Sequence, residues 1–306
     1  MAITFHARTA LRLLAASVAL GACLGLLAVP ARAQDAAKPK AGAADKPSRI
    51  VSLDLCTDQL LLDLVARERI AAVTHLAADP AVSAMPEKAR GLPITHGEAE
   101  DVLRHNPDLI LAGPFGVSAT VDLLRRLKRN VAIVPLASDL DGVRTSVRTV
   151  AAAVGETAKG EAVIADFDRR LAALSPPQAD AAAKPTALIY QVGGSVSGAG
   201  SLADAVLAAA GFRNMTAEYR LTRAGQVPLE LLVATPPDLI VLATAADAYR
   251  TTAADNLRHP ALRFLRQRRA SLELPWQLWL CGTPVIAEAV VRLAEARAKL
   301  TAARTR

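Results

Sequence analysis

Short apolar runs alternate with longer amphipathic segments along most of the chain. The runs are rich in aliphatic and β-branched residues, and several lack the polar alternation of a half-exposed strand. Strands covered on both faces by helices have this pattern. The alternation of strand-like and helical segments predicts an α/β fold with parallel-type sheets flanked by helices. The expected strands are Ile50–Leu53, Ile70–Thr74, Leu109–Ala112, Val131–Pro135, Ala187–Gln191, Leu239–Ala243 and Ser271–Leu274.

The middle of the chain breaks this alternation. From Val143 to Leu174 the pattern is helical, interrupted only at Gly155, and the stretch after Gly155 has one apolar and one charged side. A long helix between two α/β halves predicts a stiff connection between two lobes, whereas an ordinary crossover helix within one larger sheet is the alternative. The predicted parts are an N-terminal lobe at 49–155, an interlobe helix at 156–175, a linker at 176–185 and a C-terminal lobe at 186–306.

A short motif occurs once in each half of the chain. Glu100 and Pro107 are seven positions apart, as are Glu230 and Pro237, and each proline opens a Pro-Asp-Leu-Ile sequence at the start of a buried run. Each unit reads as a short helix, a turn that ends at proline, and a strand. The repetition predicts two related lobes.

Residues 1–33 have the pattern of an export signal. Arg8 and Arg12 form a basic start, Leu13–Val29 is an apolar run, and Ala31–Ala33 offers the small-x-small pattern of a cleavage site. The apolar run is also about as long as the shortest membrane span, so an uncleaved anchor is an alternative.

A second processing site precedes the one just described. Leu20-Gly21-Ala22-Cys23 resembles a lipoprotein box, although the apolar run continues beyond Cys23, where a lipoprotein usually turns polar. Residues 34–48 contain almost nothing to bury and are expected to form a disordered tether.

Charge and cysteine content narrow the classes of function. Removal of residues 1–33 takes three arginines away and lowers the formal net charge from +7 to +4, with the remaining basic residues scattered. A nucleic-acid partner is therefore not expected. Cys56 and Cys281 remain, and an even pair in an oxidising compartment suggests a disulfide. Their Cα atoms would have to lie within about 7 Å, which the sequence leaves open. No cysteine–histidine run has zinc spacing.

Four stretches carry a resemblance to a known family: Arg49–Asp54, Gly97–Ala112, Gly198–Asn214 and Gln226–Leu242. Together they resemble the periplasmic iron-chelate and vitamin B12 binding proteins of ABC transporters, the class with a single helical hinge. The likeness extends from about residue 48 to about residue 300. It implies two α/β lobes facing each other across a ligand cleft, a periplasmic monomer without a cofactor of its own, and an inner-membrane permease dimer with its ATPase as partner.

The resemblance assigns a docking role to one exposed glutamate on each lobe, which pairs with arginines of the two permease subunits. Glu100 and Glu230 fall on those motif positions. Two separated carboxylates on a rigid body would fix orientation and increase the association rate more than the affinity. On composition alone, each would be an ordinary solvated helix acid.

The resemblance also places loops at the strand ends along the cleft, where ligands of α/β sheets bind. His75 and His96 follow first-lobe strands and could ligate iron or cobalt. Arg220 and Arg223, beside Tyr219, suit anionic groups of a ferric siderophore. The full set of cleft candidates is Cys56, Thr57, His75, His96, Phe115, Gly193, Gly194, Tyr219, Arg220, Arg223, Trp276 and Trp279.

Each group in that set has a plainer alternative. The histidines and arginines could be ordinary loop or surface residues, and the glycines could simply shape the cleft wall. One of Trp276 and Trp279 is expected to stack on a flat ligand and the other to lie in the core. The resemblance puts Cys56 and Cys281 near the cleft on opposite lobes, so a bridge between them would lock the lobes together.

The function expected from the sequence is capture of an iron–siderophore-type chelate and its delivery to a permease. Haem and cobalamin are alternative ligands within the same family. No nucleophile–base pair, catalytic carboxylate pair or metal triad has a recognisable spacing, so no catalytic or metal site is assigned. A chelatase-like enzyme acting through His75 or His96 is the alternative from another class, and a sensor or surface scavenger is a third.

Overall fold

The computed structural model describes residues 46–174, 184–243 and 251–304. The predicted signal peptide, the predicted tether up to residue 45 and most of the predicted linker lie outside the described residues. In the described part of the chain, no helix is both long and apolar enough to cross a membrane.

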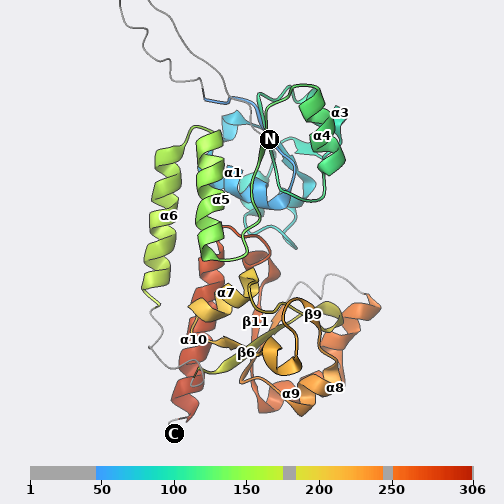
Figure 1. Cartoon of the computed structure of the whole chain (residues 1–306), viewed down its shortest axis with the longest axis vertical. Helices are drawn as coiled ribbons and strands as arrows, with labels where there is room; N and C mark the ends of the chain where they lie inside the picture. The colour runs from blue at the N-terminus through green and yellow to red at the C-terminus, as the bar shows by residue number, and fades with distance from the viewer. Residues whose placement is uncertain (1–45, 175–183, 244–250, 305–306) are drawn as a thin grey trace, which may run out of the picture. The chain divides into compact units, whose positions relative to one another are not determined.

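The first lobe is built on a parallel five-stranded sheet with the order β3-β2-β1-β4-β5. Figure 1 draws this lobe in blue and green. The central strand β1 is fully buried and pairs with β2 on one side and β4 on the other. This order places strands on both sides of the first one, so the loop after β1 lies at a topological switch point, where α/β proteins bind ligands. The strands are β1 Ile50–Ser52, β2 Ile70–Thr74, β3 Ile94–Thr95, β4 Leu109–Ala112 and β5 Val131–Ile133.

Helices cover both faces of this sheet, which explains why its strands lack polar alternation. One core contains Leu61, Leu64 and Val150 of helices α1 and α5. The other contains Val102 and Leu124 of α3 and α4. The helices of this lobe are α1 Leu55–Leu64, α2 Pro86–Ala89, α3 Ala99–Arg104, α4 Ser118–Arg126 and α5 Leu140–Ala153, with the 3₁₀ turns η1 Arg67–Arg69 and η2 His75–Ala78.

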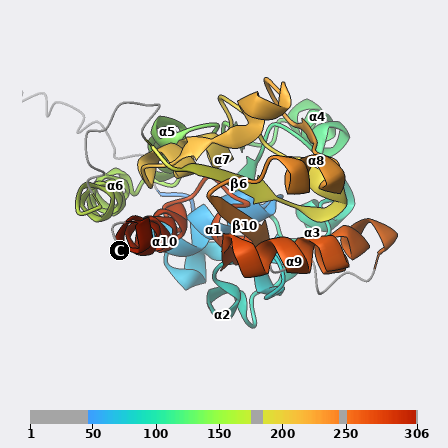
Figure 2. The same cartoon turned by 90° about the horizontal axis from the view of Figure 1, so that it is seen from below.

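The second lobe repeats the plan with a parallel four-stranded sheet, β11-β10-β6-β8, among the described residues. Strands β6 and β10 lie between the helices α7 (Leu202–Ala209) and α9 (Pro260–Arg268), as Figure 2 shows. A separate two-stranded antiparallel pair, β7 with β9, folds beside the end of β6. The strands are β6 Thr186–Tyr190, β7 Ser195–Val196, β8 Arg213–Asn214, β9 Gly225–Gln226, β10 Leu239–Ala243 and β11 Ala270–Leu274.

The helices of the second lobe also form two layers. Core residues of α7 and α10 pack on one face of the sheet, and those of α8 and α9 on the other. The helices are α7 Leu202–Ala209, α8 Leu229–Ala234, α9 Pro260–Arg268 and α10 Ile286–Arg304, with the 3₁₀ turns η4 Val192–Gly194, η5 Met215–Tyr219, η7 Thr252–Arg258 and η8 Trp276–Leu278.

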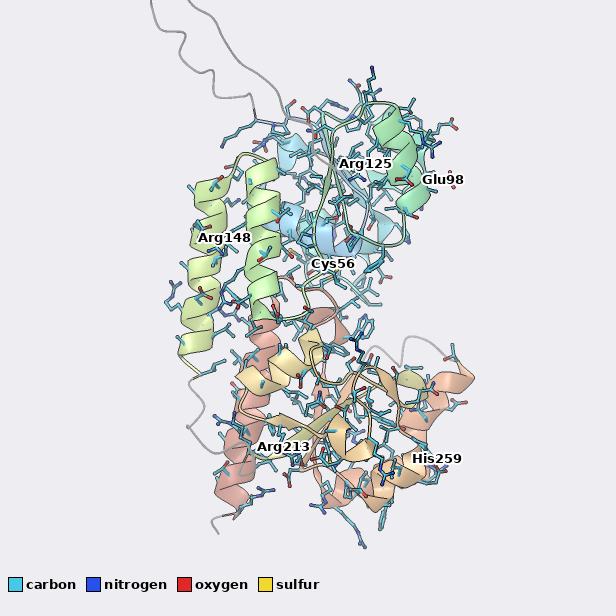
Figure 3. All side chains as sticks on the ribbon, viewed as in Figure 1. Cys56, Glu98, Arg125, Arg148, Arg213 and His259 are labelled. Atoms are coloured by element: carbon cyan, nitrogen blue, oxygen red, sulfur yellow. A yellow bond between two sulfur atoms is a disulfide. The ribbon has the colours of Figure 1, made fainter. Side chains whose placement is uncertain are left out.

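The long helical stretch at mid-chain forms two helices, α5 and then α6 (Thr157–Ala172). Gly155, with φ of +74°, ends α5 in a left-handed conformation that favours glycine. Ile164 of α6 belongs to the core of the first lobe and Phe167 to a core of the second, so this helix packs against both. Arg148 of α5 lies between the two helices (Figure 3) and pairs with Glu161 of α6.

The repeated Pro-Asp-Leu-Ile motif has the same structural role in both lobes. The Asp108 carboxylate accepts hydrogen bonds from the backbone N–H groups of Ser48 and Arg49, just before β1. The Asp238 carboxylate accepts from the backbone N–H and the hydroxyl of Thr186, at the start of β6. Each aspartate therefore fastens the first strand of its lobe to the neighbouring strand that follows the motif.

Candidate functional site

Loops at the carboxyl ends of the first-lobe strands enclose a pocket of about 160 Å³. They follow β1, β4 and β5, which are neighbours in the sheet, and parallel strands bring such loops to one edge. Most of the lining is apolar, and a single residue of the second lobe contributes to it. The lining residues are Asp54, Cys56, Thr57, Leu60, Gly113, Pro114, Phe115, Val134, Pro135, Leu136, Ala137, Ser146 and Gly282.

Two large apolar side chains of this lining are exposed to solvent. Phe115, in the loop after β4, is 72% exposed, and Leu136, in the loop after β5, is 62% exposed. A single exposed apolar residue is common on protein surfaces, but two at one pocket form a patch of the kind that ligands cover. The pocket is therefore suited to an apolar ligand surface.

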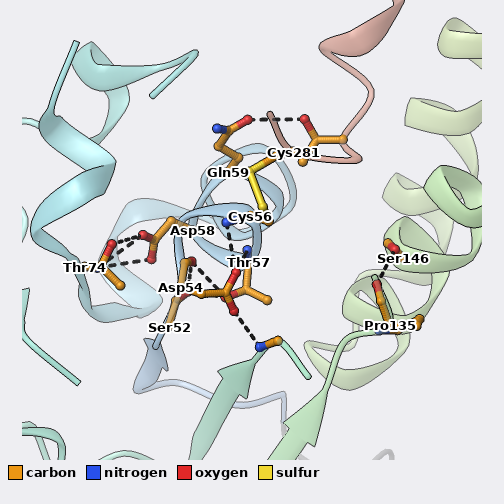
Figure 4. The surroundings of a disulfide bond; sticks show 12 residues. Ser52, Asp54, Cys56, Thr57, Asp58, Gln59, Thr74, Pro135, Ser146 and Cys281 are labelled. Carbon is orange, nitrogen blue, oxygen red and sulfur yellow. Dashed lines mark hydrogen bonds between the residues drawn. A yellow bond between two sulfur atoms is a disulfide. The ribbon is translucent and has the colours of Figure 1, made fainter. Parts of the chain in front are cut away.

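Asp54 positions two of the pocket loops (Figure 4). Its Oδ1 accepts from the backbone N–H groups of Cys56 and Thr57 and caps helix α1. Its Oδ2 accepts from the Thr57 hydroxyl at 2.9 Å and from the Gly113 N–H at 2.5 Å. A Cβ at Gly113 would lie 3.0 Å from that oxygen, so only glycine fits without adjustment. The carboxylate thus joins the loops after β1 and β4.

A buried polar network lies behind the pocket. The Asp58 carboxylate accepts from both the backbone N–H and the hydroxyl of Thr74 and also bonds to Ser52. The Ser52 hydroxyl lies 2.7 Å from the hydroxyl of Thr57. Burial raises the pKa of Asp58 from 3.8 to about 7, against the opposing effect of the Thr74 hydrogen bonds. Through this network the ends of β1 and β2 are held together.

A disulfide joins the two lobes at the pocket. Cys56, in the first turn of α1, is bonded to Cys281, and their Cα atoms are 5.2 Å apart (Figure 4). Beside it, the Thr283 hydroxyl donates to Oε1 of Gln59 at 3.2 Å. The bridge places a loop of the second lobe directly against the start of helix α1 in the first lobe.

Further contacts fasten the same second-lobe loop. Nε2 of Gln277 donates to the carbonyl oxygen of Pro80 at 2.6 Å. A Cβ at Gly282 would lie only 2.3 Å from the Cβ of Ala137, so the backbone at Gly282 passes too close to the first lobe for a side chain. The segment from η8 to α10 is therefore held by helix α1 and by two loops of the first lobe, those that contain Pro80 and Ala137.

His75 and His96 lie side by side at the ends of β2 and β3. Their rings are stacked with centroids 5.2 Å apart, and both residues are exposed. The backbone N–H of His96 donates to the Asp101 carboxylate, and this bond is the main cause that lowers the pKa of Asp101 to about 2. The two imidazoles are presented together, although neither lines the pocket.

The second-lobe candidates serve mainly to pack their own lobe. Tyr219 is buried, its hydroxyl donates to the Thr235 carbonyl at 2.6 Å, and burial raises its pKa to about 12. A Cβ at Gly194 would lie 2.7 Å from the Val227 carbonyl oxygen, which explains the glycine there.

The other second-lobe candidates do not line the pocket either. Arg220 lines a separate cavity of about 450 Å³ with Asn214 and Thr216. Arg223 is exposed, and its carbonyl oxygen packs against Gly198. The N–H of Gly193 donates to Asn256.

The two tryptophans form an edge-to-face pair with ring centroids 5.1 Å apart. Trp279 is buried in a core of the second lobe, and Trp276 packs against that core while remaining partly exposed. Of the twelve cleft candidates, only Cys56, Thr57 and Phe115 line the pocket.

Glu100 and Glu230 occupy equivalent places in the two lobes. Each is exposed and lies in the first turn of its helix, α3 or α8. Acids are favoured in this position by the helix dipole.

Sequence reasoning missed Asp54 and Leu136. Asp54 had a readable signal, because an aspartate between a strand and a helix is a typical N-cap. Leu136 had none, since an apolar residue after a strand usually becomes core.

Comparisons with known proteins agree with this architecture. Residues 50–268 match the family described as periplasmic binding protein. A cobalamin-binding protein from Halobacterium salinarum is 28% identical over 211 residues, which cover 68% of this chain and 57% of that protein. The chain thus spans less than two thirds of the length of that relative.

Solved structures share the fold. The periplasmic haem-binding protein RhuT from Roseiflexus sp. RS-1 superposes with a TM-score of 0.65 at 24% identity, covering 82% of this chain and 99% of that one. The periplasmic vitamin B12 binding protein BtuF of Vibrio cholerae gives 0.62 at 18% identity, covering 84% and 98%. With the family match extending over most of the chain, this protein belongs to the periplasmic binding protein family.

Proposed function

We propose that this chain is the binding component of an ABC importer and that it captures a metal chelate with an apolar macrocyclic face. A corrinoid is the preferred candidate for this chelate. The observation that carries the proposal is the apolar pocket with Phe115 and Leu136 exposed at its edge. The volume of about 160 Å³ is below that of a complete site for a drug-sized ligand. Part of the chelate would enter the pocket and the rest would lie outside it.

Charge favours a corrinoid over the siderophore expected from the sequence. Among the described residues, no lysine or arginine lines the pocket, and its one acid, Asp54, already accepts from neighbouring N–H and O–H groups. Catecholate or carboxylate siderophores are anionic and need cationic partners. The rim of a corrin ring carries neutral amides, which need none. The similarity to the cobalamin-binding protein from Halobacterium salinarum also favours a corrinoid over a siderophore.

Haem is the second candidate because of the histidine pair. Haem iron takes an imidazole nitrogen as an axial ligand, and His75 and His96 present two exposed imidazoles together. Haem also carries two carboxylates, for which the pocket lining offers no cation. This ranks haem below a corrinoid.

Delivery to the permease is assigned to Glu100 and Glu230. Their equivalent positions on α3 and α8 suit ion pairs with arginines of two equivalent permease subunits. Charge reversal at both positions should abolish uptake and leave the affinity for the chelate unchanged. Normal transport by the double variant would contradict the docking role.

Calorimetric titration of the purified mature protein tests the ligand assignment. Cyanocobalamin, haemin and a ferric catecholate siderophore are compared for the wild type, Phe115→Ala, Leu136→Ala and a matched control, Leu127→Ala. Leu127 is exposed like the other two but directly follows α4, outside the pocket. Covering a large apolar side chain contributes about 1.5–3 kcal/mol, so each pocket variant should bind cyanocobalamin about tenfold or more weakly.

The possible outcomes test the identity of the ligand separately from the role as an importer component. Preferential binding of the siderophore would overturn the corrinoid assignment while leaving the importer role intact. Unchanged affinity in both pocket variants would show that the chelate binds elsewhere.

A further inference from the structure

In each lobe, the helix that carries the glutamate packs against a second helix. Helix α3, with Glu100, packs against α4, and helix α8, with Glu230, packs against α9. Helices α4 and α9 occupy equivalent places, because each follows the strand of the Pro-Asp-Leu-Ile motif and precedes an edge strand of its sheet. The two lobes therefore present the same pair of helices.

The second helices expose a large apolar side chain at the same position. Leu123 of α4 is 43% exposed and Phe264 of α9 is 48% exposed. In both helices this residue directly precedes a buried leucine and follows another buried residue by two positions. The buried residues that set this register are Val121 and Leu124 in α4, and Leu262 and Leu265 in α9.

Neither side chain belongs to the hydrophobic cores beneath α4 and α9, which are filled by the buried neighbours. The Phe264 ring contacts the guanidinium of Arg268 in its own helix, 4.2 Å from the ring centroid, and still remains 48% exposed. Isolated exposed apolar residues are ordinary, but a matched pair on two related surfaces is not expected from chance placement. Leu127, directly after α4, and Leu231 on α8 are also exposed and enlarge the apolar area of their own lobes.

We propose that Leu123 and Phe264 are a second pair of docking contacts, and that each lobe offers one glutamate and one apolar side chain to one subunit of a permease dimer. This inference rests on the proposed importer function. A partner with two equivalent subunits explains why the same combination occurs twice, since each subunit would meet the same surface.

The glutamates and the apolar side chains would affect different steps of binding to the permease. Exposed ion pairs contribute little net affinity and act mainly on the rate of encounter. Apolar side chains that become buried slow dissociation. Glu100 and Glu230 would thus increase the association rate with the permease, whereas Leu123 and Phe264 would lower the dissociation rate.

The test measures binding kinetics on nanodiscs that hold an ABC-importer permease–ATPase complex from the protein's own host, with empty nanodiscs in parallel. Leu123→Ala, Phe264→Ala and their combination are compared with Glu100→Lys and Glu230→Lys. Ile94→Ala is the control, because Ile94 is an exposed apolar residue on β3, outside both helix pairs.

Burial of about half of each side chain predicts that each alanine variant binds about fivefold more weakly and the double variant about 25-fold more weakly. The loss should appear in the dissociation rate. The glutamate variants should instead lower the association rate. Affinity for cyanocobalamin should be unchanged in the alanine variants, because neither residue lines the pocket.

Several outcomes would overturn the inference. If the alanine variants dissociate like the wild type while the lysine variants fail to bind, the apolar contacts are wrong and the importer function stands. An effect from only one lobe would contradict the paired arrangement. Binding to empty nanodiscs that the alanine variants lose would make the partner a lipid surface. If the wild type does not bind the permease nanodiscs, both this inference and the docking role fail.

Discussion

Loss of the interlobe disulfide should destabilise the protein strongly. The bridge joins residues 225 positions apart in the sequence. In the chain-entropy model, releasing a closed loop of that length lowers the free energy of unfolding by up to about 5 kcal/mol, and native disulfides usually contribute about 2–4 kcal/mol. The double variant Cys56→Ser/Cys281→Ser is the suitable perturbation, because a single substitution would leave the other cysteine as an unpaired, reactive thiol.

Urea unfolding measures this effect, followed by the fluorescence of Trp276 and Trp279, which lie beside the bridged loop. With a slope of about 2–3 kcal/mol per molar urea for a chain of this size, the midpoint should fall by about 1–2 M. In a reducing agent, the wild type should unfold at the same urea midpoint as the variant, and the midpoint of the variant should not change. Equal midpoints for oxidised wild type and variant, or two free thiols in the oxidised mature protein, would show that the bridge does not stabilise the fold.

Two further perturbations concern the same region. Burial raises the pKa of Asp58 from 3.8 to about 7. Between these two pH values the folded chain keeps a proton on Asp58 that the unfolded chain releases, so the free energy of unfolding should fall as the pH rises from about 4 to about 7. Asp58→Asn should flatten that fall in melting temperatures recorded from pH 5 to pH 8, and a variant with the wild-type slope would contradict this. Gly282→Ala should lower the melting temperature by several degrees, because its Cβ would lie 2.3 Å from that of Ala137. The combination with Ala137→Gly should restore it, and an unaltered single variant would show that the loop yields freely.

The sheets were predictable because their strands are buried. The apolar runs at Ile70–Thr74, Leu109–Ala112 and Leu239–Ala243 coincide with β2, β4 and β10. Strands of two residues, such as β3 and β8, are too short to produce any period, and the sequence did not reveal them. They exist only because a longer strand beside them supplies the hydrogen bonds.

The site was less predictable because its contacts join distant parts of the chain. The bond between Asp54 and Gly113 spans 59 positions, and no local pattern records it. An even number of cysteines suggested a bridge, but only the Cα separation of Cys56 and Cys281 brings them within reach. Tyr219 looked like a cleft residue from its loop, yet its ring packs in the core because its hydroxyl finds a carbonyl there.

Capture of a metal chelate is tested most directly by the absorption spectrum of the protein isolated from its own host, followed by titration of the emptied protein. We expect the bands of a corrinoid, or of haem, at one chelate per chain, and recovery of the same spectrum when cyanocobalamin or haemin is added back. A featureless spectrum, together with no binding of cyanocobalamin, haemin or a ferric siderophore, would contradict capture of a metal chelate.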